Sequence, residues 1–119
     1  MFRVAVADQI NGFKRRLFGQ GKVVCPETGE RLDYANCFID HVASSGASFN
    51  DLKRGFLELK GLREQDIKAK QKKGSLFMDF EDKGLREEWR EYHAQHAVLR
   101  GVNAKWSHGE GFRNRAKRK

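Results

Sequence analysis

Residues 36–42 read NCFIDHV, a short β-prone run that decides the fold in the middle of this chain. Successive side chains of a strand point to opposite faces, so Ile39 and His41 are expected on one face and Asp40 on the other. Asp40 and His41 can therefore serve one site only where the strand ends or carries a bulge. This adjacent pair is the feature around which the rest of the sequence is interpreted.

The segment before this run predicts a helix and a turn. A helix is expected over about residues 4–18, because apolar residues recur at steps of four, three and four, namely Val6, Ile10, Phe13 and Leu17. Glycines at positions 19 and 21 then end it. Residues 22–32, KVVCPETGERL, predict a strand end followed by a turn, since a proline and a Thr-Gly pair break a short apolar run.

The segment that follows predicts a helix and then a less regular stretch. Ser48 and Asp51 form a pair of the capping-box kind, so a helix is expected from about residue 49 to residue 60. Residues 62–74, LREQDIKAKQKKG, are polar and basic, and we interpret them as a mobile connector or a loop facing nucleic acid. Residues 75–80, SLFMDF, predict a short aromatic strand.

A last helix is expected after Asp82, which can cap it. It shows the clearest apolar stripe of the chain, formed by Leu85, Trp89, Tyr92, His96 and Leu99. The helix is expected to continue, or to bend at Gly101, into residues 102–108. His96 is interpreted as a packed core histidine on this stripe, while His93 lies beside the stripe and is open to a structural or a catalytic role. The fold class is therefore α+β, with one small domain over residues 1–111 and a basic tail over 112–119.

The charge of the chain favours a polyanionic partner. The 119 residues carry a formal net charge of +8. Basic segments at 1–22, 60–73 and 100–119 alternate with mildly acidic segments at 23–59 and 74–99. Basic segments that a fold brings onto one face suit the repeating phosphates of nucleic acid, although a solvated surface that keeps a small protein soluble is the alternative. No apolar run approaches the length of a membrane span, so no membrane partner and a cytoplasmic location are expected.

Asp40 and His41 are the residues with the clearest chemical potential. A carboxylate supplies a hard oxygen ligand for a divalent metal, and an imidazole titrates near neutrality. Hydrolysis of a phosphodiester needs both a bound metal and a proton acceptor, because charge develops on the phosphate and water must lose a proton. The alternative is an ordinary surface hydrogen bond. The two cysteines, Cys25 and Cys37, are too few for a disulfide framework and are expected to be reduced.

Four stretches together resemble the HNH, or His-Me finger, endonucleases of phage and homing type. These stretches are VVCPETGE at 23–30, NCFIDHV at 36–42, SFNDLKRGF at 48–56 and EYHAQHAVLRGVNAKWSHGEG at 91–111. In that superfamily a knuckle with a cysteine and a glycine turn precedes a strand bearing Asp-His, and a later helix carries a Leu-Arg motif followed by a metal ligand. The resemblance implies a ββα-metal core, here a short β-hairpin flanked by amphipathic helices.

Carried onto this sequence, the resemblance makes His41 the general base and Asp40 a metal ligand. Alignment of the Leu-Arg motif brings Ser107 to the second ligand position, but His108 is favoured because imidazole is a far better ligand than a serine hydroxyl. Asn103 and His93 remain supporting candidates. The implied cofactor is Mg²⁺ or Mn²⁺. A structural zinc is not expected, since only Cys25 of the family's cysteine pairs is present in the knuckle and Trp106 stands where a later cysteine would be.

The partner implied by this resemblance is nucleic acid, with DNA favoured over RNA. The basic side chains expected to grip it are Lys14, Arg15, Arg16, Lys70, Lys72, Lys73, Arg100, Lys105, Arg113 and Arg115. The expected activity is metal-dependent hydrolysis of DNA. The alternative is a catalytically inactive protein on the same scaffold that binds nucleic acid or a host protein as a regulator, which the missing cysteines favour.

Overall fold

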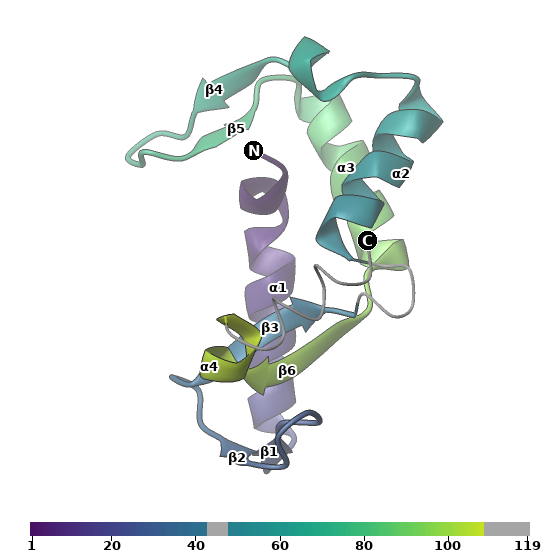
Figure 1. Ribbon diagram of the computed structural model, residues 1–119. Helices are drawn as coiled ribbons and strands as arrows, with labels where there is room; N and C mark the ends of the chain where they lie inside the picture. The colour runs from purple at the N-terminus through teal and green to yellow at the C-terminus, as the bar shows by residue number, and fades with distance from the viewer. Residues whose placement is uncertain (43–47, 109–119) are drawn as a thin grey trace.

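The fold is α+β, as the sequence predicts, with one long helix that runs past three small sheets (Figure 1). A computed structural model describes residues 1–42 and 48–108. The elements are α1 (Phe2–Gly19), β1 (Val23–Val24), β2 (Arg31–Leu32), β3 (Cys37–His41), α2 (Phe49–Lys60), η2 (Glu64–Asp66), β4 (Ala69–Gln71), β5 (Met78–Phe80), α3 (Lys83–His96), β6 (Leu99–Asn103) and α4 (Ala104–Trp106). Within the described ranges, no helix is long and apolar enough to cross a membrane.

Helix α1 connects two separate hydrophobic clusters. Phe2, Ala5 and Val6 at its start belong to a cluster with α2, α3 and β5. The second half of α1 packs against a cluster formed by β1, β2, β3 and β6. Ile10, in the middle of the helix, contacts both clusters. The predicted stripe over 4–18 is therefore real, and its two halves are buried against different parts of the protein.

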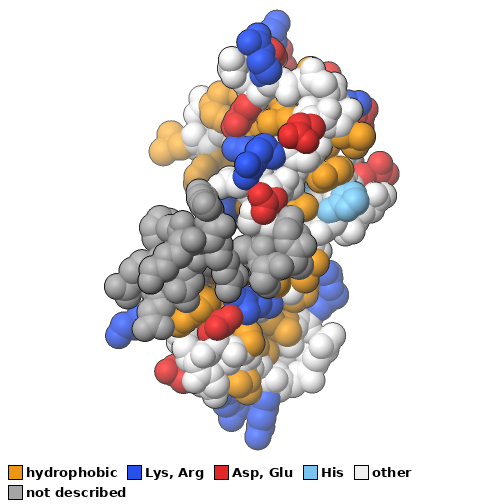
Figure 2. Space-filling view, turned by 45° about the vertical axis from the view of Figure 1, so that its right-hand side comes forward, with side chains coloured by type: hydrophobic (Ala, Val, Ile, Leu, Met, Phe, Trp, Pro, Cys, Tyr) orange, Lys and Arg blue, Asp and Glu red, His pale blue; other side chains and the backbone are white. Residues whose placement is uncertain are grey.

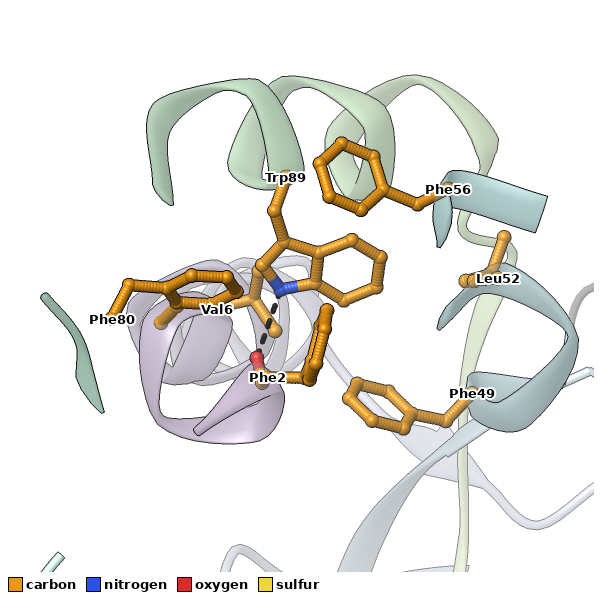
Figure 3. Close-up of a cluster of buried hydrophobic side chains, with 8 residues drawn as sticks. Phe2, Val6, Phe49, Leu52, Phe56, Phe80 and Trp89 are labelled. Carbon is orange, nitrogen blue, oxygen red and sulfur yellow. Dashed lines mark hydrogen bonds between the residues drawn. The ribbon is translucent and has the colours of Figure 1, made fainter. Parts of the chain in front are cut away.

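Trp89 lies at the centre of the first cluster (Figure 3). Its indole is fully buried and its Nε1 donates a hydrogen bond to the backbone oxygen of Phe2 at 2.9 Å. The rings of Phe2, Phe49 and Phe56 surround it at centroid distances between 5.2 and 5.9 Å. Edge-to-face packing of this kind stabilises aromatic pairs beyond the burial of their area. The cluster fixes α3 against α1 and α2.

The candidate site is carried by an antiparallel pair, β3 and β6. Their register aligns His41 with Leu99 and Asp40 with Arg100. Helix α4 follows β6 directly, whereas α2, η2, β4, β5 and α3 lie between β3 and β6 in the chain. Gly101 allows α1 to approach the pair, because a Cβ at this position would lie 2.8 Å from Leu17 Cδ2. The sheet is thus pressed onto α1 at the point where β6 crosses it.

Local start and stop signals agree with the predictions in several places. Ser48 Oγ accepts a hydrogen bond from the backbone N–H of Asp51, and α2 ends at Gly61 in the left-handed conformation. Asp82 caps α3 through the backbone N–H of Leu85. Cys25 begins a tight turn, with its N–H bonded to the oxygen of Glu30. These elements are determined by residues close to them in sequence.

Two predictions about the second half of the chain are wrong. Residues 62–74 are not simply a connector, because they contain η2 and the strand β4, which pairs antiparallel with β5. The last helix does not continue through Gly101 but ends at His96, and residues 99–103 form the strand β6. Leu99 therefore belongs to a strand, and the Leu-Arg motif starts a strand where the resemblance implies a helix.

Candidate functional site

Asp40 and His41 lie at the end of β3 and point to opposite faces of the strand. The pairing of β3 with β6 is regular through both residues, with no bulge between them. Both are nonetheless buried, and both line a hollow of about 140 Å³ at the edge of β3 that β6 does not cover. The hollow is therefore bordered by both residues, although their side chains leave opposite faces of the strand.

His41 is held by a chain of hydrogen bonds that crosses from β3 to α3 and α1. Its Nε2 lies 2.9 Å from Nε2 of His93, whose Nδ1 lies 2.8 Å from Oε1 of Gln9. The amide nitrogen of Gln9 donates to the backbone oxygen of Arg90 at 3.1 Å. A carbonyl oxygen only accepts, so this last bond fixes the orientation of the Gln9 amide.

The orientation of Gln9 determines which ring nitrogens carry protons. Oε1 of Gln9 can only accept, so the neutral His93 ring carries its proton on Nδ1. Nε2 of His93 is then the acceptor, and Nε2 of His41 is the donor between the rings. The lone pair of His41 consequently lies on Nδ1, and His41 is one of the residues that line the hollow. The network presents His41 as a base of defined tautomer.

Both imidazoles are neutral at physiological pH. His41 is 5% exposed and His93 is 1% exposed. Burial, the neighbouring His93 ring and the Arg3 guanidinium lower the pKa of His41 from 6.5 to about 4. Burial and Arg3 likewise lower the pKa of His93 to about 4. Desolvation disfavours a charged imidazole, and a nearby cation adds to this effect.

Asp40 lies on the other face of β3, within an ionic cluster that joins the strand to the knuckle, the turn of residues 23–30. Arg100 Nε approaches Asp40 Oδ2 at 3.4 Å, and Arg100 Nη1 donates to Glu27 Oε1 at 2.8 Å. The contact with Glu27 is the shorter one, so Arg100 is held mainly by the knuckle. Its guanidinium also lies 5.8 Å from the ring centre of Trp106. Arg100 was predicted to grip nucleic acid, but in this structure two carboxylates engage it.

The candidates near the end of β6 differ in where they lie. The ring of His108 contacts that of Phe38 at 5.4 Å, and Phe38 shares its face of β3 with Asp40. Ser107 is fully buried. The side-chain oxygen of Asn103 accepts a hydrogen bond from the backbone N–H of Trp106, so Asn103 is the N-cap of α4. Among the described residues no group of three or more His, Cys, Asp or Glu side chains is arranged to hold a metal ion.

The hollow beside His41 also has a positive side. Arg3 lines it, with its guanidinium 4.2 Å from the ring centre of Phe49. Ser48, Phe49 and Asn50 line it from the start of α2, where the helix dipole favours negative charge. Larger hollows lie elsewhere on the surface, but Asp40 and His41 do not line them. Asp40, His41 and Arg3 thus border the same small hollow.

The basic side chains predicted to contact nucleic acid do not all lie together. Arg15 and Arg16 are near the end of α1, and Lys70, Lys72 and Lys73 belong to the β4–β5 hairpin beside its start (Figure 1). Lys14 lies over the ring of Tyr34, and Lys105 is exposed on α4. Arg113 and Arg115 lie outside the described residues. On the face shown in Figure 2, basic side chains lie at both ends of the molecule and also between them, where they are interspersed with acidic and apolar ones.

The structure also identifies residues that the sequence interpretation missed. Gln9 and Arg3 gave no signal, because each lies among ordinary helix residues far from residue 41 in sequence. His93 had a signal, since it follows Trp89 by four residues and shares its face of α3. The histidine on the buried face is therefore His93, whereas His96 is exposed beside the Tyr92 ring, contrary to its predicted role in the core.

The candidate site thus rests on its own geometry and on the resemblance of its motifs. Comparison of the chain with models of protein families, with curated proteins and with solved structures found no match.

Proposed function

We propose that this chain is a metal-dependent endonuclease of the HNH type, which hydrolyses phosphodiester bonds of DNA. The observation that supports this most directly is the fixed tautomer of His41. His41 is buried, its Nε2 is bonded to His93 so that the lone pair lies on Nδ1, and the residue lines a hollow, an arrangement suited to a general base. The pairing of β3 with β6, which places Leu99 opposite His41 and Arg100 opposite Asp40, brings the Asp-His and Leu-Arg motifs of the resemblance side by side.

In the proposed reaction His41 takes a proton from the attacking water at Nδ1. The bond from its Nε2 to His93 persists during this step and helps to stabilise the imidazolium that forms. A pKa of about 4 keeps the ring unprotonated, but it also makes a weak base. A phosphate in the hollow would offset the charge of Arg3 and so raise the pKa of His41 towards neutrality. Substrate binding would thereby strengthen the base.

The proposed reaction also needs a magnesium or manganese ion, and it would have few protein ligands here, since the described residues contain no group of three or more candidate ligands. Asp40 and His108 would hold it, and Mg²⁺ usually keeps several waters and substrate phosphate oxygens alongside one or two carboxylates. The bound ion would stabilise negative charge on the phosphate and the leaving oxygen. For the ion to bind, Arg100 would have to leave Asp40, while it could keep its shorter contact with Glu27. Arg3 and the start of α2 would position the phosphate.

Cleavage of a supercoiled plasmid tests this proposal. The purified protein should nick the plasmid with Mg²⁺ or Mn²⁺ and should not do so in EDTA. His41→Ala should reduce the rate by about 100-fold or more, the usual loss when a general base is removed. His96→Ala is the matched control, since this histidine is exposed on α3 and should cleave like the parent.

Two checks keep the plasmid experiment interpretable. His41 is buried, so circular dichroism must show that His41→Ala is folded under the assay conditions; Asp40→Asn, a nearly isosteric change, provides a second inactive variant. The proposal is wrong if the folded parent does not cleave with either metal. It is equally wrong if folded His41→Ala cleaves at the parental rate.

A second function is favoured by the ion pair between Arg100 and Asp40. That pair occupies the carboxylate expected to bind metal, as it would in an inactive protein that binds nucleic acid or a host protein. This function predicts salt-sensitive DNA binding that survives EDTA and is unchanged in Asp40→Ala, together with no cleavage. Loss of binding in Asp40→Ala alone would contradict it.

A further inference from the structure

The β4–β5 hairpin has a well-anchored base. Phe80 is buried in the first hydrophobic cluster, and Asp79 forms an ion pair with Arg86 of α3 at 3.1 Å. From this base the two strands lead away from α1 and the helices (Figure 1). A hairpin fixed at one end and exposed at the other can hold its tip in a defined position.

The tip of this hairpin is a closed turn. The backbone N–H of Lys72 bonds to the oxygen of Phe77 at 2.8 Å, and the N–H of Ser75 bonds to the oxygen of Lys72 at 3.0 Å. Gly74 takes the left-handed conformation that the turn requires, with φ at +75°. The Gln71 side chain adds a bond to the oxygen of Ser75 at 2.9 Å. The side chains at the tip are therefore displayed by a structured backbone.

Three consecutive apolar side chains are exposed at this tip. Leu76 is 92% exposed, Phe77 is 67% exposed and Met78 is 43% exposed. Isolated exposed apolar residues are ordinary, but a contiguous group on a projecting element marks a binding surface. Burial of this group against a partner would remove an unfavourable contact with water.

Cations surround the same group. The segment from Lys68 to Met78 contains four lysines, at 68, 70, 72 and 73, and no acidic residue. Lys72 lies opposite Phe77 across the hairpin, and Lys70 shares that face because it is two residues away along the strand. Lys70 and Lys72 thus share a face of the hairpin with Phe77, and Asp79, which lies opposite Lys70, forms an ion pair with Arg86. An apolar tip whose charged neighbours from residue 68 to residue 78 are all lysines is complementary to stacked bases flanked by phosphates.

We propose that this tip, residues 72–78, is a wedge that inserts Leu76 and Phe77 against the base pairs of duplex DNA from the minor groove. Proteins that kink duplexes use apolar side chains in this way, while neighbouring cations contact phosphates. This inference rests on the nucleic-acid partner of the proposed function and not on its chemistry. The wedge gives the hairpin a second role. Its lysines alone would only contact the phosphate backbone of the DNA, whereas the wedge unstacks a base step.

Binding to duplex DNA in EDTA tests the wedge without cleavage. The double variant Leu76→Ser with Phe77→Ser should lose about tenfold or more in affinity, because contacts to bases are removed. Its salt dependence should stay parental, since no charge changes. Lys72→Gln with Lys73→Gln should instead lower the slope of log affinity against log salt by about two. Leu59→Ser, at a 72% exposed position on α2, is the matched apolar control and should bind like the parent.

A duplex containing 2-aminopurine gives the second measurement. Its fluorescence should rise when the parent binds and unstacks a base step, and this rise should disappear in the Leu76→Ser, Phe77→Ser variant. The wedge is refuted if that variant binds and unstacks like the parent. It is also refuted if the tip residues prove to be needed for binding anionic lipid vesicles or for dimerisation in solution while duplex affinity does not depend on them.

The two proposals fail in different ways. If the parent binds and unstacks the duplex but never cleaves it, the wedge stands and the nuclease proposal falls. If the parent cleaves plasmid but the apolar tip variant binds and unstacks unchanged, the nuclease proposal stands and the wedge falls.

Discussion

Acidification from pH 7 to pH 5 should destabilise this protein by about 4 kcal/mol, because two buried imidazoles must gain protons when the chain unfolds. The pKa of His41 and that of His93 are each lowered from 6.5 to about 4 by burial and by neighbouring positive groups. At pH 5 the unfolded chain therefore binds nearly one proton at each position, while the folded protein binds almost none. Burial of the two neutral imidazoles is therefore tolerated at no cost in protonation above pH 6.5, and the stability of the folded protein is lost progressively as the pH falls from 6.5 towards 4.

The size of the effect follows from linkage. A histidine whose pKa is 6.5 in the unfolded chain and about 4 in the folded protein lowers the stability of the protein by about 2 kcal/mol between pH 7 and pH 5. Two such histidines lower it by about 4 kcal/mol. This is a large part of the 5–15 kcal/mol that holds a typical domain folded. The hydrogen bond between the rings adds a constraint, since two protonated rings would place two N–H groups face to face.

Urea unfolding in EDTA at pH 7, 6 and 5, followed by tryptophan fluorescence, measures this directly because Trp89 is buried beside His93. His93→Gln removes one titrating ring and should roughly halve the change between pH 7 and pH 5, whatever its stability at pH 7. His96→Gln, at an exposed position, should leave the change as it is in the parent. A parental change below about 1 kcal/mol, or an unaltered change in His93→Gln, would refute the reasoning.

Three further predictions concern stability and can be checked by urea unfolding at pH 7. Gly101→Ala should lower the free energy of unfolding by about 1–3 kcal/mol, because the new Cβ would lie 2.8 Å from a side chain of α1. Gly19→Ala is the control, since a Cβ there meets no atom within 4 Å and should not lower stability. Equal effects of the two substitutions would contradict the close approach at Gly101. Ser48→Ala should cost about 1 kcal/mol by removing the cap of α2, and Ser48→Thr should restore most of it. Trp89→Phe should lower the free energy of unfolding by about 3 kcal/mol, since it leaves a cavity and removes the hydrogen bond to the Phe2 oxygen. A loss below about 1 kcal/mol would show that the cluster repacks.

The sequence predicted those elements whose signals are local. The caps at Ser48 and Asp82 act within three residues, so the starts of α2 and α3 could be found without tertiary information. The strand β3 has enough apolar and β-branched residues to be recognised by itself. The fold class followed from these pieces.

Elements stabilised by distant partners could not be predicted in the same way. Strand β4 is exposed along its length, so its sequence lacks the alternation of a half-buried strand, and only pairing with β5 defines it. Leu99 keeps the helical spacing of the stripe on α3, yet it leaves the helix to pair with His41. Neither glycine nor proline marks the end of α3 at His96. Tertiary pairing overrides the local pattern here.

The candidate site was predicted in part for the same reason. Asp40 and His41 are adjacent, so their chemistry was visible in the sequence. Gln9 and His93 reach His41 only through the packing of α1 and α3, and their roles come from the three-dimensional network.

The pairing of β3 with β6 has a further consequence for how the molecule folds. Its two strands are separated by the whole segment 42–98, so their ladder closes a long loop and is entropically slow to form. The first hydrophobic cluster uses α2, α3 and β5, which lie within that segment, together with the start of α1. This cluster can therefore form first and shorten the effective loop. His41 and His93 then meet only when β6 docks, so any chemistry at His41 appears with the last step of folding.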